Sequence, residues 1–193
     1  MDLHQYHQSL LGGGRLYWRA LPPGAEHQEQ HRAVWSMAEG VLGAAPSDFD
    51  RLPGGKPVLP ARPGVHFSLS HCAGLAVCFV AQTTCGVDAE PVRPLRPRVL
   101  RRAFTPEEQR LIAQSPAPDE TFFRLWTLKE SFIKATGEGL SRPLDTIPVI
   151  LTSDGVHTLD PAWHFAQITV ERAVVSVCTA AVDHLDSGGN GAP

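Results

Sequence analysis

Two carboxylates at the end of an apolar segment have the types and spacing needed for metal-dependent chemistry. They are Asp88 and Glu90 in the sequence Gly86-Val87-Asp88-Ala89-Glu90. On a β-strand, residues two positions apart project from the same face, with about 7 Å between their Cα atoms. Two like charges beside a hydrophobic core repel each other and resist desolvation, so they favour binding of a hard cation such as Mg²⁺. The alternative is a strand end at which both side chains are simply hydrated.

A second cluster lies in a segment with helical spacing. Trp126, Glu130 and Lys134 are successive i,i+4 neighbours and therefore share one face of a helix. Taken alone, Glu130 and Lys134 would form a surface ion pair contributing about 0.3–0.5 kcal/mol, and Trp126 would be a core residue. If this face meets the acidic strand end, three carboxylates enclose one cation and Lys134 is placed to bind a phosphate. The spacing by itself is compatible with both arrangements.

Three further segments contain candidates for binding an anion. Gly54-Gly55-Lys56-Pro57 places a lysine in a glycine-flexed loop, although it lacks the Ser/Thr and the helix of a P-loop. Ser70 can donate a hydrogen bond to a phosphate, and His71 can donate or transfer a proton near neutral pH. Arg32, in a predicted helix, is a further candidate. The alternatives are a solvated loop lysine at position 56 and a polar strand end at positions 70 and 71.

Helices and strands must position these residues, and the hydrophobic pattern predicts two similar halves. In the first half it predicts a helix at residues 26–42 and strands at residues 16–19, 65–69, 75–81 and 85–89. A proline- and arginine-rich connector follows at residues 91–97. In the second half the pattern predicts a helix starting at Thr105, a longer helix at residues 119–136, and strands at residues 146–151, 163–170 and 174–182. In each half, a helix is therefore predicted to be followed by three antiparallel strands.

The overall composition excludes several classes of protein. The 193 residues are 42% hydrophobic and 19% charged, as in a globular protein, and the formal net charge of −3 does not indicate a nucleic-acid binder. The longest apolar run, Leu75 to Ala81, is too short to cross a bilayer. The four cysteines lack metal-binding spacing, and the polar N-terminus has no signal-peptide core. We therefore expect a cytoplasmic protein with free thiols and no membrane or nucleic-acid partner.

Taken together, the motifs resemble the surfactin-type phosphopantetheinyl transferases, a family of holo-carrier-protein synthases. The resemblance extends over about residues 56–140. It is based, in chain order, on Lys56-Pro57, Phe67-Ser68-Leu69-Ser70-His71, Gly86-Val87-Asp88-Ala89-Glu90, Trp126-Thr127-Leu128-Lys129-Glu130-Ser131-Phe132-Ile133-Lys134 and Gly137-Glu138-Gly139-Leu140. The Gly-Val-Asp-x-Glu motif alone is weak, but its combination with W-x-x-K-E-x-x-x-K is specific.

The resemblance implies an α+β, pseudo-dimeric fold. Each of two similar halves would have a helix packed on a three-stranded, mainly antiparallel sheet, with coenzyme A bound in the cleft between them. We expect an N-terminal half at residues 1–95, a C-terminal half at residues 96–185 and a disordered tail at residues 186–193. Such a pseudo-dimeric chain is expected to act as a monomer.

The resemblance also implies a role for each candidate residue. Mg²⁺, or alternatively Mn²⁺, would be coordinated with the pyrophosphate of coenzyme A by Asp88, Glu90 and Glu130. The nucleotide end and its 3′-phosphate would be held by Lys56, Pro57, Ser70 and His71, with Arg32 as a helper. The catalytic residues would be Glu130, Lys134 and His71, of which Lys134 also contacts the pyrophosphate. Either Glu130 or a metal-bound water would act as the base.

The implied reaction transfers 4′-phosphopantetheine from coenzyme A to a serine of an acyl- or peptidyl-carrier protein and releases adenosine 3′,5′-bisphosphate. Such phosphoryl transfer depends mainly on positioning and charge neutralisation. Five arginines in and just after the connector would attract an acidic carrier, namely Arg93, Arg96, Arg98, Arg101 and Arg102. Two alternatives remain: a non-catalytic homologue that binds coenzyme A or a carrier, and a metal-dependent nucleotide pyrophosphatase that uses water as the nucleophile.

Overall fold

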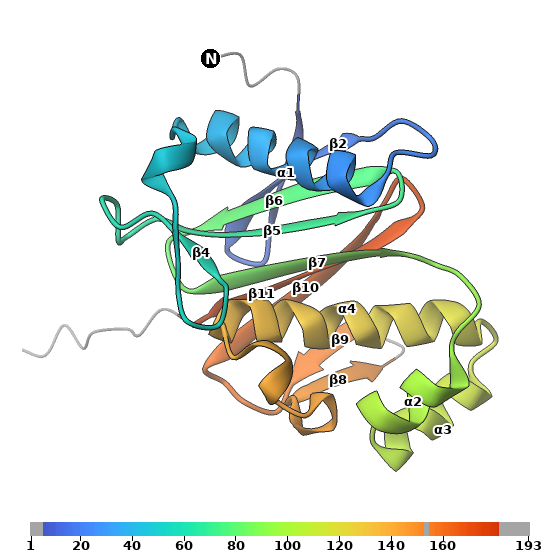
Figure 1. The fold of residues 1–193 in the computed structure, drawn as a ribbon. Coiled ribbons are helices and arrows are strands. Elements are labelled where there is room, and N and C mark those ends of the chain that lie inside the picture. The colour runs from blue at the N-terminus through green and yellow to red at the C-terminus, as the bar shows by residue number, and fades with distance from the viewer. Residues whose placement is uncertain (1–5, 153–154, 182–193) are drawn as a thin grey trace, which may run out of the picture.

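The chain folds into two halves that lie one above the other in Figure 1. The computed structural model describes residues 6–152 and 155–181, so the tail predicted at residues 186–193 lies outside the described residues. The first half contains β1 (His7–Leu11), β2 (Gly14–Ala20), α1 (His27–Leu42), β3 (Asp50–Arg51), β4 (Pro57–Val58), β5 (His66–Cys72) and β6 (Leu75–Ala81). The rest contains β7 (Cys85–Pro91), α2 (Pro97–Ala103), α3 (Pro106–Gln114), α4 (Pro118–Thr136), β8 (Val149–Thr152), β9 (Gly155–Thr158), β10 (Trp163–Val170) and β11 (Ala173–Ala180).

The N-terminal half is an antiparallel sheet covered by α1. Its strand order is β1-β2-β6-β5, and β3 and β4 form a separate two-stranded ribbon. Helix α1 starts after Glu26, whose backbone N–H donates to Glu29 Oε2 at 2.9 Å, and ends at Gly43, where φ is 57°. Its apolar face buries Val34 and Met37 in one core cluster with residues of β6. Helix α1 is thereby fixed above one wall of the site described below.

The C-terminal half packs α4 on a second antiparallel sheet. This sheet has the order β10-β11-β7, while β8 and β9 pair separately. The predicted helix start at Thr105 is confirmed, because Thr105 Oγ1 accepts from the Glu108 backbone and Glu108 Oε2 accepts from the Thr105 backbone. Helix α4 ends at Gly137, whose φ of 74° is readily adopted by glycine. The connector is followed by the short helix α2, which the sequence pattern did not predict.

Strand β7 leaves the first half and completes the sheet of the second. We predicted three strands after the helix of each half. The first sheet instead has four strands, because β1 and β2 join β6 and β5 and β7 leaves it, and the second has three, because β7 pairs with β11 while β8 pairs with β9. The α+β class and the antiparallel pairing are confirmed. At the seam, β5 offers serine hydroxyls to β7: Val87 N donates to Ser68 Oγ at 3.0 Å and Ala89 N to Ser70 Oγ at 3.2 Å. The boundary at residue 95 stays a prediction.

Helix α4 lies very close to β7. A Cβ atom at Gly86 would lie 2.0 Å from the Ser131 carbonyl oxygen and 2.4 Å from the Ala135 nitrogen, so only glycine fits at this crossing. This approach brings the side chains that follow Gly86 on β7 next to those of α4.

All four cysteines are free and buried, as expected. Within the described ranges, no helix is both long enough and apolar enough to span a bilayer.

Candidate functional site

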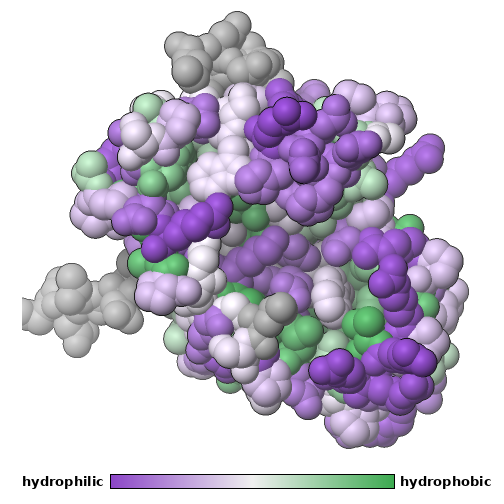
Figure 2. Space-filling view, viewed as in Figure 1, coloured by the Kyte–Doolittle hydropathy of each residue, from purple (hydrophilic) through white to green (hydrophobic). Residues whose placement is uncertain are grey.

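Strand β7 and helix α4 bring the three predicted acidic residues to one cavity between the halves. Its volume is about 340 Å³, and it is lined by Leu69, Ser70, His71, Asp88, Ala89, Glu90, Trp126, Glu130 and Lys134. In Figure 2 the surface is hollowed between the two halves, and much of the hollow is hydrophilic. The helical face that contains Trp126, Glu130 and Lys134 therefore meets the acidic end of β7. We call this space the acidic cavity.

Asp88 is the central acceptor of the acidic cavity. Its Oδ1 accepts hydrogen bonds from Lys134 Nζ at 2.7 Å and from Ser70 Oγ at 3.1 Å, and Lys134 Nζ also lies 3.0 Å from Ser70 Oγ. The second oxygen, Oδ2, is buried and has no hydrogen-bond partner among the described residues. A buried carboxylate oxygen without a donor is costly, so this atom is suited to a ligand that supplies positive charge.

The surroundings of Glu130 disfavour its charged form. Burial, followed by the neighbouring Asp88 charge and more weakly by Glu90, raises the pKa of Glu130 to about 7, although Lys134 acts in the opposite direction. Three carboxylates with two nearby cations, Lys134 and Arg93, leave excess negative charge in a partly dry space. A bound cation would relieve this repulsion. The same pKa lies in the range that suits proton transfer near neutral pH.

The oxygen-rich lining fits a hard divalent cation, although its ligands are not fully assembled. Glu90 forms an ion pair with Arg93, with 2.6 Å between Oε2 and Nη1. Within residues 6–152 and 155–181, no group of three His, Cys, Asp or Glu side chains is arranged to hold a metal. Lys134 and Arg93 instead compensate Asp88 and Glu90. Carboxylate donors without thiolates favour Mg²⁺ or Mn²⁺, and the roles of these residues as metal ligands stay a prediction.

The lysine beside Glu130 has a structural role. The Lys129 side chain is fully buried, and its ammonium donates to Glu108 Oε1 at 2.7 Å and to the Leu144 carbonyl at 2.9 Å. It also lies 5.5 Å from the centroid of the Phe104 ring. Burial lowers the pKa of Lys129, and the Glu108 carboxylate opposes this effect. Lys129 therefore links α4 to α3 and to the segment after α4, on the opposite side from the acidic cavity.

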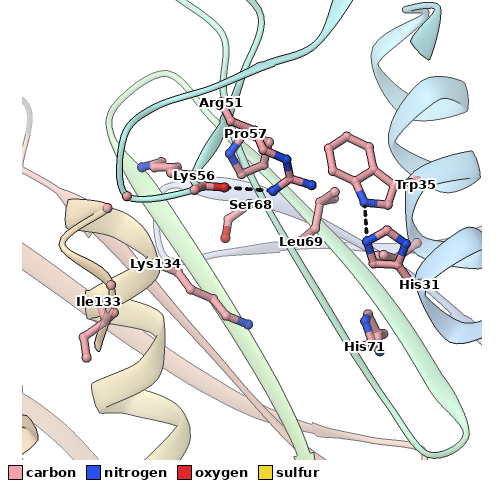
Figure 3. A pocket seen from close by; sticks show the side chains of 15 residues that line it. His31, Trp35, Arg51, Lys56, Pro57, Ser68, Leu69, His71, Ile133 and Lys134 are labelled. Atoms are coloured by element: carbon pink, nitrogen blue, oxygen red, sulfur yellow. Dashed lines mark hydrogen bonds between the residues drawn. The ribbon is translucent and has the colours of Figure 1, made fainter. Parts of the chain in front are cut away.

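A second cavity continues from the acidic cavity towards α1 and the β3–β4 loop. Its volume is about 270 Å³, and it shares Leu69, His71 and Lys134 with the acidic cavity. We call it the nucleotide cavity, after the part of coenzyme A that the sequence predicts its residues to bind. Its walls include Trp35 of α1 and Arg51, both labelled in Figure 3, together with Gly54, Gly55, Lys56, Pro57, Gly137 and Gly139. Pro57, a predicted binding residue, is thus part of this wall.

His71 lies at the junction of the two cavities and contacts α1. Its Nδ1 is 3.2 Å from Gln30 Oε1, and its ring centroid lies 5.0 Å from that of His27 and 6.1 Å from that of His31. Burial is the largest cause that lowers the pKa of His71, followed by His27, His31 and Lys134. His71 is therefore largely neutral at pH 7 and offers one donor and one acceptor.

The predicted phosphate-binding residue Lys56 is already engaged. Its Nζ donates to the Ala135 carbonyl near the end of α4 and, at 3.1 Å, to the Cys85 carbonyl at the start of β7. Burial lowers the pKa of Lys56. Figure 3 shows its side chain directed away from Arg51. The lysine lines the nucleotide cavity with its hydrocarbon chain, and its charge satisfies backbone carbonyls of the second half.

Arg32 was predicted in the site, and the structure does not bring it there. It is exposed on α1 and does not line either cavity, because the helix turns its neighbour His31 towards the nucleotide cavity instead. Sequence reasoning also missed Trp35 and Arg51. The i,i+4 spacing of His31 and Trp35 was an available signal, and Trp35 Nε1 donates to His31 Nε2 at 3.0 Å.

Comparisons with known proteins match this geometry. The 4′-phosphopantetheinyl transferase superfamily matches residues 84–178, which contain both acidic clusters. The chain is 36% identical over 172 residues to the 4′-phosphopantetheinyl transferase HetI of Nostoc sp., which covers 81% of this chain and 72% of that protein. The chain belongs to the 4′-phosphopantetheinyl transferase family. The resemblance predicted from the motifs is confirmed.

Two further members of the phosphopantetheinyl transferase family show similar agreement. A 4′-phosphopantetheinyl transferase of Bacillus subtilis is 36% identical over 141 residues, which is 68% of this chain and 62% of that protein. The 4′-phosphopantetheinyl transferase psf-1 of Bacillus pumilus is 34% identical over 149 residues, 72% of this chain and 64% of that protein. The matched part of the chain thus spans less than two thirds of the length of these two relatives.

Proposed function

We propose that this chain transfers 4′-phosphopantetheine from coenzyme A to a serine hydroxyl of a carrier protein, with Mg²⁺ as the divalent cation. The main support is the meeting of Asp88 and Glu90 from β7 with Glu130 and Lys134 from α4 in one cavity. The acidic cavity adjoins the nucleotide cavity. Coenzyme A has its pyrophosphate next to its nucleotide end, so the pyrophosphate fits the acidic cavity while the nucleotide end fits the nucleotide cavity. Both halves of the site come from a single chain, which therefore acts as a monomer.

Asp88, Glu90 and Glu130 are the proposed ligands of the cation. A divalent cation held by these residues would neutralise the pyrophosphate charge and would favour departure of the nucleotide. The buried, unpartnered Asp88 Oδ2 and the raised pKa of Glu130 both support this assignment. Lys134 is close enough to Asp88 to exchange that contact for an oxygen of the pyrophosphate.

The chain's own groups position the reactants and move one proton. The serine oxygen of the carrier attacks the β-phosphorus of coenzyme A, and the bond from that phosphorus to the bridging oxygen breaks. Adenosine 3′,5′-bisphosphate leaves with the bridging oxygen. Glu130 accepts the serine proton, and Lys134 compensates the charge on the departing phosphate. His71, at the junction of the cavities, and the adjacent Ser70 of the acidic cavity orient the nucleotide end.

The carrier is proposed to approach over the connector and α2. Five exposed arginines lie there: Arg93, Arg96, Arg98, Arg101 and Arg102. A small cavity of about 200 Å³, lined by Phe122, Phe123, Trp126 and others, joins this surface to the acidic cavity through Glu90 and Trp126. A basic surface with an apolar hollow suits an acidic carrier that presents an apolar side chain near its serine.

A transfer assay tests the proposal directly. The chain is incubated with coenzyme A, Mg²⁺ and a panel of apo acyl- and peptidyl-carrier proteins, and the mass of each carrier is measured. We expect one phosphopantetheine per carrier, lost when a chelator is added or when the acceptor serine is replaced by alanine. No mass shift across the panel would contradict the proposal.

Two other outcomes would indicate the alternative functions. Release of phosphopantetheine in the absence of any carrier would indicate a pyrophosphatase. Binding of coenzyme A that is independent of Mg²⁺, without transfer, would indicate a non-catalytic homologue.

A further inference from the structure

The nucleotide cavity contains one cation whose donors are largely uncommitted. Three of its described lining residues have a strongly basic side chain: Arg51, Lys56 and Lys134. Lys56 donates to two backbone carbonyls, and Lys134 contacts Asp88 and Ser70. Within the described chain, the Arg51 side chain donates a single hydrogen bond, from Nη1 to the Gly55 carbonyl at 2.9 Å, while its backbone N–H donates to Asp50 Oδ1. A guanidinium has five N–H donors, so most of those of Arg51 remain available.

The loop that contains Arg51 is fixed in place by the second half of the molecule. Leu52 N donates to the Lys56 carbonyl at 2.9 Å, and Gly55 adopts a φ of +84°. A Cβ at Gly54 would lie 1.8 Å from the Gly137 carbonyl oxygen, so this loop packs directly on the end of α4. Together with the two carbonyl contacts of Lys56, this packing closes one wall of the cavity. The position of Arg51 therefore depends on Lys56.

The Arg51 side chain rests on an aromatic surface that faces the cavity. Its guanidinium carbon lies 5.2 Å from the centroid of the Trp35 ring, and Figure 3 shows Arg51 and Trp35 side by side above His31 and His71. Trp35 is held in turn by its hydrogen bond to His31. This cation–π contact restrains the guanidinium, and a weakly hydrated planar cation with parallel N–H groups suits a phosphate group.

We propose that Arg51 binds the 3′-phosphate of coenzyme A and that Lys56 is a positioning residue that holds the Arg51 loop. The inference rests on the proposed function. Coenzyme A has two anionic groups, the pyrophosphate and the 3′-phosphate. Lys134 and the carboxylates define the pyrophosphate end, and Arg51 lies in the part of the nucleotide cavity that the acidic cavity does not share. Arg51 thus selects coenzyme A over its analogue without the 3′-phosphate.

Calorimetry with two nucleotides distinguishes a contact to the 3′-phosphate from a contact to the base or ribose. Adenosine 3′,5′-bisphosphate has the 3′-phosphate, and 5′-AMP lacks it. For Arg51→Gln we expect binding of the bisphosphate to weaken about tenfold, which corresponds to about 1.4 kcal/mol, while 5′-AMP binding changes less than twofold. Arg110→Gln, on the exposed surface of α3, removes the same charge outside the cavity and should leave both affinities unchanged.

The positioning role of Lys56 predicts a different pattern. Lys56→Met should lower the midpoint of thermal unfolding by several degrees, because two carbonyls lose their donor. Lys56→Met should weaken the binding of both nucleotides by similar factors, because it displaces the loop and removes no contact with the ligand. In steady-state transfer, Arg51→Gln should raise KM for coenzyme A and leave kcat unchanged, and it should narrow the preference for coenzyme A over 3′-dephospho-coenzyme A.

Three results would overturn the inference. Equal weakening of both nucleotides in Arg51→Gln would mean that Arg51 contacts the base or ribose. Selective loss of bisphosphate binding in Lys56→Met but not in Arg51→Gln would make Lys56 the phosphate ligand. A wild-type chain that binds neither nucleotide would overturn the proposed function itself, before any variant is compared. If Lys56→Met does not fold, the comparison of the exposed Arg51 with Arg110 decides the inference.

Discussion

The two adjoining cavities hold their charges in different ways. In the acidic cavity, the functional side chains lie on regular elements, β7 and α4, whose contact is fixed by Gly86. In the nucleotide cavity, Arg51 and Lys56 lie at either end of a glycine-containing loop that docks on the end of α4. The carboxylates of the acidic cavity repel one another. In the nucleotide cavity, Lys56 donates its hydrogen bonds to backbone carbonyls, whereas Arg51 lies over the ring of Trp35.

This difference teaches which charges are free for a ligand. Excess charge in the acidic cavity follows from residue type, because three carboxylates exceed the cations around them whatever their exact contacts. At the nucleotide end, two basic residues five positions apart have opposite fates. Lys56 is buried against carbonyls, and Arg51 is exposed over Trp35. A residue's charge therefore does not indicate a binding role until its hydrogen-bond partners are known.

The largest expected effect is on the acidic cavity. Asp88→Asn and Glu130→Gln should each lower kcat about a thousandfold in the carrier-modification assay, because each removes charge that positions the cation or accepts the proton. Circular dichroism should show an unchanged fold. Glu120→Gln, on the exposed first turn of the same helix, is the matched control and should retain activity within about twofold. Near-normal rates in both site variants would remove the acidic cavity from the mechanism.

The packing of β7 against α4 predicts a loss of stability. Gly86→Ala would place its Cβ within 2.4 Å of two backbone atoms of α4, and backbone cannot move aside as a side chain can. We expect a loss of about 3 kcal/mol in the free energy of unfolding, seen as a fall of about 6–12 °C in the thermal midpoint. Gly64→Ala, where nothing lies within 4 Å, is the control. Equal midpoints for the two variants would contradict the tight crossing.

Titration of Glu130 predicts a pH-dependent difference in stability. Its pKa is raised to about 7 in the folded state, from about 4.3 in an unfolded chain. The folded state binds the Glu130 proton more tightly than the unfolded state. The resulting contribution to the free energy of unfolding is complete below about pH 4 and is lost as the pH rises through about 7. Without divalent cations, the free energy of unfolding of wild type relative to Glu130→Gln should fall by about 2–3 kcal/mol between pH 4.5 and pH 8.

Two checks separate this effect from other titrations. The lowered pKa values of His66 and His71 act in the opposite direction, but they are present in both proteins and largely cancel in the difference. Addition of Mg²⁺ at pH 8 should recover part of the lost stability in wild type only. Parallel stability curves for wild type and Glu130→Gln, measured by urea unfolding, would rule out the raised pKa.

The smallest effect is expected at a residue that sequence reasoning placed in the site. Arg32→Ala should change KM for coenzyme A by less than about twofold, because the side chain is exposed and outside both cavities. Measured beside Arg51→Gln, it tests whether position or charge decides binding. A tenfold rise in KM for Arg32→Ala would reverse the comparison between the two arginines.

The sequence by itself determined which side chains share a face in each of the two walls of the acidic cavity. Helical i,i+4 spacing placed Trp126, Glu130 and Lys134 on one face, and period-two spacing placed Asp88 and Glu90 on another. These periods are properties of the local backbone, so they can be read without knowing the partners. The helix start at Thr105 and the stop at Gly137 follow from capping chemistry in the same way.

Tertiary structure alone decided the sheet to which β7 belongs and the role of each basic side chain in the nucleotide cavity. The transfer of β7 depends on pairing with β11, some 85 residues later, and on serine hydroxyls of β5 that satisfy its other edge. The engagement of Lys56 depends on carbonyls of Cys85 and Ala135, which reach it only after α4 packs on β7. Local spacing cannot encode such contacts, because a charge is bound or free according to groups that distant parts of the chain bring to it.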